Sequence, residues 1–273
     1  MKKFEGMLFC TDLDGTLLKR DKTISKENIS AIEYFKEEGG FFTFVTGRMP
    51  FFVSDIYEAI NPNVPFGCID GGGLYDHRKM QYVWTQELAA KALELLAYAD
   101  QSFPTLGIQI NTFDRTYFCK ENKTMERFRR ATKVPNLVCD YHNFHEPIAK
   151  ILFGDERPDT IRLLQEKLNA HPMASAFDFI RPEENLYEIL PKGVSKGGVL
   201  LKLIEILGVD PNKTIAIGDY NNDISMIRAA KLGVAVSNAC SDAKAAADYV
   251  TVSNEEHAIA KIIEELDHGA IVL

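Results

Sequence analysis

The sequence predicts an α/β protein in which a parallel-sheet core is interrupted by an inserted α+β domain. Short apolar runs alternate with helix-period segments at both ends of the 273-residue chain, a pattern typical of a parallel sheet covered by helices. Between these ends, strand-like runs at 106–111 and 115–120 are separated by a short turn, which predicts a hairpin and therefore antiparallel pairing. We expect residues 1–82 and 189–273 to form the core and residues 83–188 the inserted domain.

The first core segment contains two apolar runs that predict buried strands. Residues 6–11 form the first, and the helix that follows is ended by Gly39 and Gly40. Residues 41–45 form the second, and residues 50–60 are expected to be helical.

The inserted and final segments show the same kinds of pattern. An apolar stripe that begins at Leu88 predicts a helix over 88–99. In the inserted domain we further expect a helix at 124–132, a strand at 148–153, a helix at 159–168 and strands at 174–180 and 186–190. In the final segment we expect a helix at 196–207, a strand at 214–217, a helix at 222–230, a strand at 233–236 and a last helix from 255.

Composition excludes several classes of protein. Apolar residues make up 46% of the chain and charged residues 26%, which rules out disordered and collagen-like chains. With 31 Lys and Arg against 39 Asp and Glu, the net charge of −8 argues against nucleic acid as a partner. No 18-residue apolar run occurs, and the first six residues lack the apolar stretch of a signal peptide. Five scattered cysteines without a C-x-x-C pair indicate a reducing compartment, so we expect a cytoplasmic protein with no membrane partner.

Two carboxylates follow the first buried strand directly. Asp12 and Asp14 come after residues 6–11, and open α/β sheets bind ligands at the carboxyl ends of their strands. Two carboxylates crowded there repel each other unless a cation or a proton offsets the charge. Mg²⁺ is a suitable cation, because it binds few carboxylates and completes its shell with water and phosphate oxygens. An acidic turn that caps the next element explains the pair equally well, so other segments must decide.

Three further segments carry polar groups at strand ends or helix starts. They are Thr46-Gly47-Arg48, Lys196, and Asp219 with Asn222 and Asp223. Helix N-termini attract anions through their free N–H groups, a lysine adds positive charge, and a threonine hydroxyl adds a donor. Together with the first two carboxylates, these groups predict a phosphate site with a divalent metal.

The motifs that carry these residues resemble those of a known family. Asp-Leu-Asp-Gly-Thr-Leu, Val-Thr-Gly-Arg, Gly-Val-Ser-Lys-Gly and Gly-Asp-x-x-Asn-Asp, in this order, resemble the four motifs of the haloacid dehalogenase-like phosphohydrolases. The long stretch between Thr46 and Lys196 leaves room for the larger, C2B-type cap of the Cof-type sugar-phosphate phosphatase subgroup. The resemblance covers essentially the whole chain. It implies a Rossmann-like core and Mg²⁺-dependent hydrolysis of small phosphate monoesters, such as sugar phosphates or related metabolites.

The resemblance also implies a role for each motif residue. Asp12 would be the nucleophile that forms an aspartyl-phosphate, and Asp14 would be the general acid and base. Thr46 would bind the transferring phosphoryl group, and Lys196 would offset charge on the nucleophile and the phosphate. The remaining expected roles are phosphate binding by Gly47, Arg48 and Asn222, and metal binding by Asp12, Asp14, Asp219 and Asp223.

Two segments depart from the family pattern and leave the substrate preference open. Asp70-Gly71-Gly72 stands where many relatives have Asn-Gly-Ala, so an acid replaces an amide near the junction with the cap. His257 lies in Glu-Glu-His-Ala, where relatives tend to have Glu-Asp-Gly-Val. We expect a small phosphorylated metabolite as the partner, bound by a monomer or a small homo-oligomer.

Other functions compete with this one. A phosphomutase would use the same chemistry and return the phosphoryl group to a sugar. A serine hydrolase would use Ser195 in Gly-x-Ser-x-Gly with His257 or His268, but it would leave Asp12 and Asp14 unexplained. A receiver domain would hold the phosphoryl group as a signal, but it needs no insert of domain size.

Overall fold

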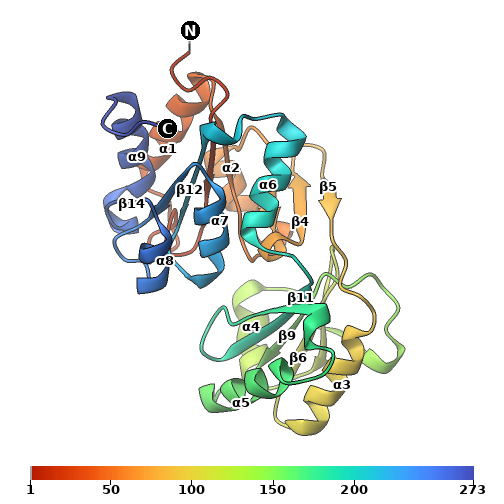
Figure 1. Cartoon of the computed structure of the whole chain (residues 1–273). Coiled ribbons are helices and arrows are strands. Elements are labelled where there is room, and N and C mark those ends of the chain that lie inside the picture. The colour runs from red at the N-terminus through yellow and green to blue at the C-terminus, as the bar shows by residue number, and fades with distance from the viewer. Residues whose placement is uncertain (1) are drawn as a thin grey trace. The chain divides into compact units, whose positions relative to one another are not determined.

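The computed structural model describes residues 2–273, which form two compact units (Figure 1). The core unit contains the described residues up to Thr85 and resumes with Ser195–Leu273. The cap unit is Gln86–Val194. The boundaries expected from the sequence, after residues 82 and 188, lie a few residues earlier in the chain.

A five-stranded parallel sheet forms the centre of the core unit, in the order β14-β13-β12-β1-β2. Strand β1 lies between β12 and β2, and its Leu8 pairs with both Phe41 and Thr214. Helices cover both faces of such a sheet, and so its central strands are apolar throughout. The strands are β1 (Leu8–Thr11), β2 (Phe41–Phe44), β12 (Thr214–Gly218), β13 (Leu232–Ala235) and β14 (Tyr249–Val250).

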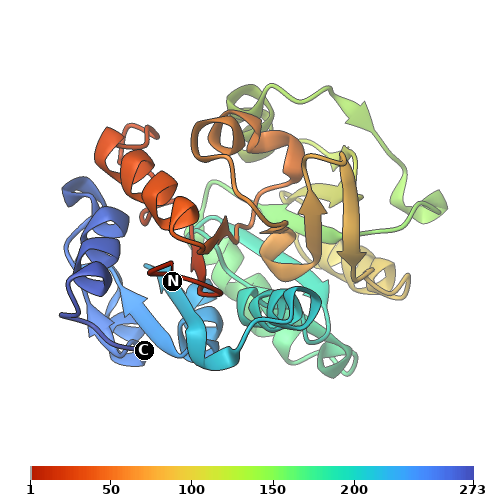
Figure 2. The same cartoon turned by 90° about the horizontal axis from the view of Figure 1, so that it is seen from above.

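The helices of the core unit pack in pairs on the two faces of this sheet. Helix α1 packs against α9 and helix α6 against α7, and Figure 2 shows the two pairs on opposite sides of the sheet. The helices are α1 (Lys26–Glu37), α2 (Ser54–Ile60), α6 (Lys196–Leu207), α7 (Ile224–Ala229), α8 (Ser241–Ala246) and α9 (Ala258–Asp267).

A small antiparallel sheet in the core unit was not expected from the sequence. It contains β3 (Phe66–Cys68), β4 (Gly73–Asp76) and β5 (Gln81–Thr85). A bridge between Val45 and Gly67 joins β3 to the segment that follows β2. This bridge brings the turn after β3 next to the end of β2, which matters for the site described below.

The cap unit contains a six-stranded sheet in the order β10-β11-β9-β6-β7-β8. The hairpin expected at 106–120 is confirmed, because β6 and β7 pair antiparallel. The strands are β6 (Gly107–Asn111), β7 (Thr116–Lys120), β8 (Leu137–Val138), β9 (Lys150–Gly154), β10 (Phe177–Ile180) and β11 (Leu186–Pro191). The helices are α3 (Ala92–Ser102), α4 (Lys123–Thr132) and α5 (Pro158–Asn169).

Several expected element boundaries were wrong. The cap's first helix begins at Ala92, because Leu88 forms a bridge with Ile148 and its N–H is used there. The strand expected over 174–180 begins at Phe177 after a 3₁₀ turn. The helix expected over 50–60 is divided into a 3₁₀ turn at Pro50–Phe52 and helix α2. Helices α7 and α9 likewise follow 3₁₀ turns, at Asn221–Asp223 and Asn254–Glu256.

Each face of the cap sheet has its own packing. Residues including Ile108 and Ile110 belong to the main apolar core, which helices α3 and α5 share through Leu95 and Leu164. A smaller cluster combines Phe118 and Leu152 with Met125 of α4, and strand alternation puts it on the opposite face. Helix α4 therefore covers part of the second face.

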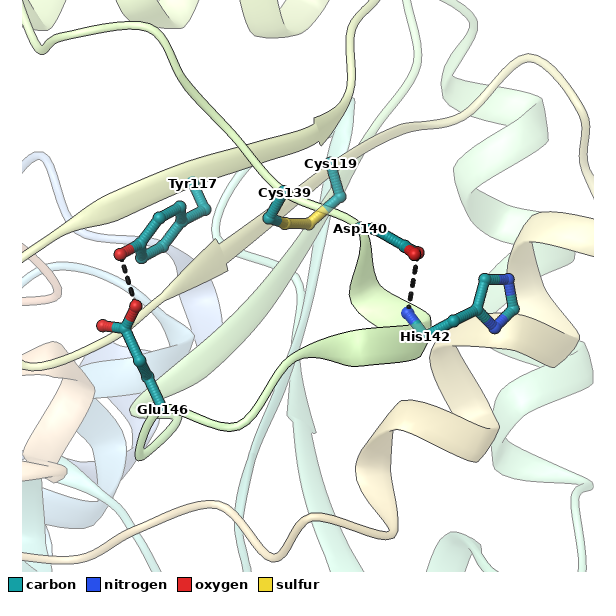
Figure 3. The surroundings of a disulfide bond; sticks show 6 residues. All are labelled: Tyr117, Cys119, Cys139, Asp140, His142 and Glu146. Carbon is teal, nitrogen blue, oxygen red and sulfur yellow. Dashed lines mark hydrogen bonds between the residues drawn. A yellow bond between two sulfur atoms is a disulfide. The ribbon is translucent and has the colours of Figure 1, made fainter.

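A disulfide joins Cys119 of β7 to Cys139, which follows β8 (Figure 3). Beside it, the Tyr117 hydroxyl donates a hydrogen bond to Glu146, and the His142 N–H donates one to Asp140. The two cysteines are 20 residues apart, and the spacing of the five cysteines does not indicate this pairing. A disulfide is not expected in a reducing compartment, so this bond disagrees with the compartment predicted from the sequence.

Candidate active site

The site lies at the carboxyl edge of the core sheet, where three neighbouring parallel strands end. Asp12 follows β1, Thr46 follows β2 and Asp219 follows β12. Because these strands are adjacent in the order β12-β1-β2, their ends meet at one edge. Lys196 is the first residue of helix α6.

Lys196 lies between two buried carboxylates. Its Nζ is 2.6 Å from Oδ1 of Asp12 and 2.5 Å from Oδ1 of Asp223. All three residues are at most 5% exposed, so these ion pairs are largely shielded from water. Burial lowers the pKa of Lys196, but the charges of Asp12 and Asp223 outweigh it and raise the pKa, which keeps the ammonium charged.

The carboxylates around this lysine outnumber it. Burial and the neighbouring charge of Asp223 raise the pKa of Asp12 well above its usual value, although Lys196 opposes the rise. Burial and Asp223 likewise raise the pKa of Asp219 to about 6, against a hydrogen bond from Thr16. These shifts indicate negative charge that the protein's own cations do not fully offset.

This charge fits a divalent metal. Asp12, Asp219 and Asp223 can each bring one carboxylate oxygen to within 4.8 Å of the other two. An all-oxygen donor set of this kind suits Mg²⁺. Asp223 also orders the loop, because its Oδ2 accepts hydrogen bonds from the N–H groups of Asp219 and Tyr220 at 2.9 and 3.0 Å.

Gly15 allows Asp219 to approach the loop after β1. Its φ is +84°, a conformation that other residues adopt only with strain. A Cβ at this position would lie 2.4 Å from Oδ2 of Asp219. The glycine of the Asp-x-Asp-Gly motif is therefore required by the position of Asp219.

Asp14 lies apart from the buried carboxylates and is held by two cations. Arg48 donates to Oδ2 through Nε at 2.9 Å and to Oδ1 through Nη2 at 2.7 Å, and Nζ of Lys22 is 2.8 Å from Oδ1. Burial raises the pKa of Asp14, but the hydrogen bonds and charges of Arg48 and Lys22 outweigh it and lower the pKa. In this structure Arg48 therefore binds the carboxylate of Asp14, whereas the sequence analysis expected it to bind phosphate.

Asp70 belongs to the site, although the sequence analysis placed it only near the junction with the cap. Its N–H donates to the Thr46 carbonyl, and its Oδ1 accepts from Nδ2 of Asn222 at 3.2 Å. A Cβ on Gly47 would lie 2.8 Å from both carboxylate oxygens of Asp70, so only glycine allows this approach. The negative charge of Asp70 also helps to raise the pKa of Lys196.

The turn that presents Asp70 is strained. Ile69 and Asp70 have φ of +55° and +53°, and left-handed backbone is rare for a β-branched residue. Strain of this kind persists only where the surrounding contacts require it, and it is concentrated at functional sites. The sequence did carry a signal for Asp70, because this acid lies in a glycine-rich turn directly after a buried strand.

The haloacid dehalogenase-like hydrolase family model matches residues 9–263. The chain belongs to this family. The resemblance stated from the four motifs is thereby confirmed, as is the assignment of the chain as a phosphatase of this family.

Relatives of this haloacid dehalogenase-like hydrolase cover most of its length. The 5-amino-6-(5-phospho-D-ribitylamino)uracil phosphatase YitU of Bacillus subtilis is 28% identical over 268 residues, which cover 94% of this chain and 96% of the relative. A haloacid dehalogenase-like hydrolase from Bacteroides thetaiotaomicron superposes with a TM-score of 0.82 at 24% identity, covering 95% of this chain and 99% of that one. The subclass IIB sugar phosphatase BT4131 gives 0.83 at 20% identity, covering 97% and 100%. The expected fold, a parallel-sheet core with an inserted α+β cap, is confirmed.

The serine proposed for the rival hydrolase mechanism caps a helix in this family member. Ser195 is the N-cap of α6, and its Oγ accepts a hydrogen bond from the N–H of Gly198 at 3.0 Å. Within residues 2–273, no histidine forms a hydrogen bond with this hydroxyl. The geometry gives Ser195 a structural role in place of a nucleophilic one.

Proposed function

We propose that this phosphatase hydrolyses small phosphate monoesters through an aspartyl-phosphate on Asp12, with Mg²⁺ as its cofactor. The observation that carries the proposal is the buried group of Asp12, Lys196, Asp219 and Asp223 at the end of the parallel sheet. Phosphoryl transfer depends mainly on positioning and charge neutralisation, and this group supplies both. Sugar phosphates or related metabolites are the proposed substrates, which agrees with the phosphorylated ribityl compound in the name of YitU.

The first half of the reaction would transfer the phosphoryl group to the enzyme. A carboxylate oxygen of Asp12 attacks phosphorus, and the bond from phosphorus to the leaving oxygen breaks. Asp14 gives its proton to that oxygen, which leaves as the alcohol. Thr46 and Lys196 would bind the transferring group, with Gly47 and Asn222 beside it.

The second half would release inorganic phosphate. Water attacks the phosphorus of the aspartyl-phosphate, Asp14 takes a proton from this water, and the bond to Asp12 breaks. The ionised Asp14 that Arg48 and Lys22 hold is the form that this step needs. To act as the acid in the first half, Asp14 must be protonated, and protonation weakens its pairing with Arg48.

The metal would be held by Asp12, Asp219 and Asp223, together with the backbone carbonyl of Asp14. Bound there, Mg²⁺ supplies positive charge that stabilises the charge on the phosphoryl oxygens. Lys196 would provide a second positive charge through its ion pair with Asp12. The roles expected from the sequence for these residues are thus kept in the proposal.

A small phosphorylated metabolite would be the partner, and we place the enzyme in the cytoplasm. Among the residues that the structure describes, no helix has both the length and the apolar character needed to cross a membrane. The net charge of −8 agrees with the proposed absence of a nucleic acid partner.

Phosphate release from a panel of phosphate esters, with and without Mg²⁺, tests the proposal. Asp12→Asn should lower kcat by roughly a thousandfold or more, since it removes the nucleophile. Asp21→Asn, a matched change of an exposed acid in the same loop, and Ser195→Ala should keep most of the activity. Retained hydrolysis in Asp12→Asn would rule out the aspartyl-phosphate, and transfer of phosphate to a second sugar in place of release would identify a phosphomutase.

A further inference from the structure

The turn that follows β3 holds Asp70 in place through contacts with two other segments of the core unit. The N–H of Asp70 donates to the Thr46 carbonyl at 3.1 Å. Gly71, the next residue, has a φ of +102° and lies against the start of helix α6. A Cβ on Gly71 would be 2.1 Å from the carbonyl oxygen of Ser195. These contacts fix the backbone that carries the Asp70 carboxylate, and all of them lie within the core unit.

The carboxylate of Asp70 is buried beside groups that we propose to bind phosphate. Asp70 is 4% exposed, and its Oδ1 accepts a hydrogen bond from Nδ2 of Asn222 at 3.2 Å. Its two oxygens are each 2.8 Å from where a Cβ of Gly47 would lie, and its negative charge interacts with Lys196. Like charges repel, so an acid at this place opposes the binding of an anion unless it has another effect.

The hydrogen bond from Asn222 joins segments that are 152 residues apart in the chain. Asn222 lies in the 3₁₀ turn Asn221–Asp223, directly before the carboxylate that pairs with Lys196. Among residues 2–273, the side chain of Asn222 makes no other hydrogen bond. The second N–H of Nδ2 and the amide oxygen are therefore left for a ligand.

An ionised carboxylate determines which end of this amide faces it. A carboxylate only accepts hydrogen bonds, and an asparagine side chain donates only through its nitrogen. Nδ2 of Asn222 must therefore face Asp70, because the opposite orientation would place two acceptor oxygens together. Phosphoryl oxygens also only accept, so they can bind the second N–H of Nδ2 but not the amide oxygen. One NH₂ group can thus donate to both anions.

We propose that Asp70 is a positioning residue for phosphate binding, because it holds the Asn222 amide in the orientation that donates to a phosphoryl oxygen. The proposal rests on the phosphatase function proposed above. Without the carboxylate, the amide can turn and present its oxygen, which repels a phosphoryl oxygen. The fixed orientation more than offsets the repulsion between Asp70 and the phosphate. Asp70 acts through Asn222 and needs no contact with the substrate.

Calorimetric titration with inorganic phosphate, in the presence of Mg²⁺, tests this role without turnover. Asp70→Asn removes the charge, keeps the shape and suits the left-handed backbone at this position, where φ is +53°. The new amide can both donate and accept, so it no longer holds Asn222 in one orientation. The Kd for phosphate should rise about fivefold, the change expected for one hydrogen bond, and kcat/KM for a good ester should fall by a similar factor. A residue that acted only by its charge would give the opposite result, a lower Kd.

The Asn222→Ala background shows whether Asp70 acts through the amide. Asn222→Ala alone should raise the Kd for phosphate about fivefold or more. When Asp70→Asn is added to it, the Kd should stay unchanged or fall, because only the repulsion between the carboxylate and phosphate is then removed. An equal rise in both backgrounds would overturn the proposal, since it would show an effect that does not need the amide.

Asp248→Asn is the matched control for loss of a carboxylate in the core unit. Asp248 also accepts one hydrogen bond, at 2.8 Å from the N–H of Gly233. Gly233 lies near the start of β13, at the edge of the parallel sheet opposite the site. This change should alter the Kd for phosphate by less than about twofold, because distant sites rarely couple.

The outcomes separate this proposal from the phosphatase function. If no ester is hydrolysed in an Asp12-dependent reaction, the phosphatase function fails and the role of Asp70 fails with it. If hydrolysis depends on Asp12 but Asp70→Asn binds phosphate as tightly as the wild type or more tightly, only the role of Asp70 is overturned.

Discussion

The guanidinium of Arg48 binds the carboxylate of Asp14 through two parallel hydrogen bonds, at 2.9 Å from Nε and 2.7 Å from Nη2. Two-point pairing of this kind fixes the orientation of a carboxylate as well as its charge. Asp14 is the proposed acid and base, so its position relative to the reacting oxygen depends on Arg48. Arg48, which the sequence suggested for phosphate binding, therefore binds the proposed proton-transfer group in this structure.

Replacing Arg48 therefore tests whether this residue positions Asp14. Arg48→Met should lower kcat by roughly tenfold to a hundredfold and change KM much less, because Asp14 loses its fixed orientation. Arg48→Lys, which keeps the charge but not the two-point geometry, should recover little of the loss. Steady-state kinetics with one good ester measures both variants. A rise in KM at constant kcat would instead support the phosphate-binding role expected from the sequence.

Replacing Lys196 should destabilise the core unit as well as abolish activity. Lys196→Met leaves Asp12 and Asp223 buried without their ammonium partner. Removing one partner of a buried ion pair costs about 3 kcal/mol or more. Urea unfolding at pH 7 measures the loss, with Lys202→Met on the solvent side of the same helix as a control. Equal stability of the two variants would contradict the buried network.

Removal of the metal should stop phosphate release and lower stability. Excess chelator should abolish activity, and Mg²⁺ at about ten times its Kd should raise Tm by roughly 2 °C or more, because it binds only the folded chain. Asp219→Asn should lose this shift, whereas Asp242→Asn, at an exposed acid, should keep it. Full activity in chelator would disprove the metal requirement.

Gly15 provides a test of the approach of Asp219. Gly15→Ala should lower activity by tenfold or more and weaken Mg²⁺ binding, since its Cβ would lie 2.4 Å from Oδ2 of Asp219. Gly208→Ala is the matched control, with φ of +64° and nothing within 4 Å of the added Cβ. Both variants carry similar backbone strain, so only a clash with Asp219 explains a difference in activity. The same activity in both would contradict this explanation.

Stability at low pH should depend on Asp155 in the cap unit. Burial raises the pKa of Asp155, but hydrogen bonds from Arg157 and Thr105 outweigh it and lower the pKa below its usual value. The ionised carboxylate therefore stabilises the folded cap above about pH 4, and this contribution disappears as the pH falls through the lowered pKa. Asp155→Asn should cost about 1–3 kcal/mol at pH 7 and much less near pH 2.

Urea unfolding at both pH values checks this prediction. Asp159→Asn is the control, because Asp159 lies close by in the first turn of helix α5 and has a largely exposed side chain. A loss of stability in Asp155→Asn that does not change with pH would show that the side chain acts through its shape and not its charge.

Local pattern in the sequence determined most of the element order and most of the site. Asp12, Thr46 and Asp219 each follow a short buried strand, and parallel strands align their carboxyl ends, so their meeting could be predicted from position alone. The four motifs also identified the family. The boundary at Leu88 was wrong because a bridge to the distant Ile148 replaced the local preference, and the boundary at Phe177 was wrong because residues 174–176 form a 3₁₀ turn.

Only the tertiary structure decided which of these groups touch one another. The pairing of Arg48 with Asp14, the entry of Asp70 into the site and the joining of Cys119 to Cys139 depend on distances between segments that are far apart in the sequence. Periodicity and spacing report which face of an element is apolar, but a contact between two polar side chains depends on how those elements pack.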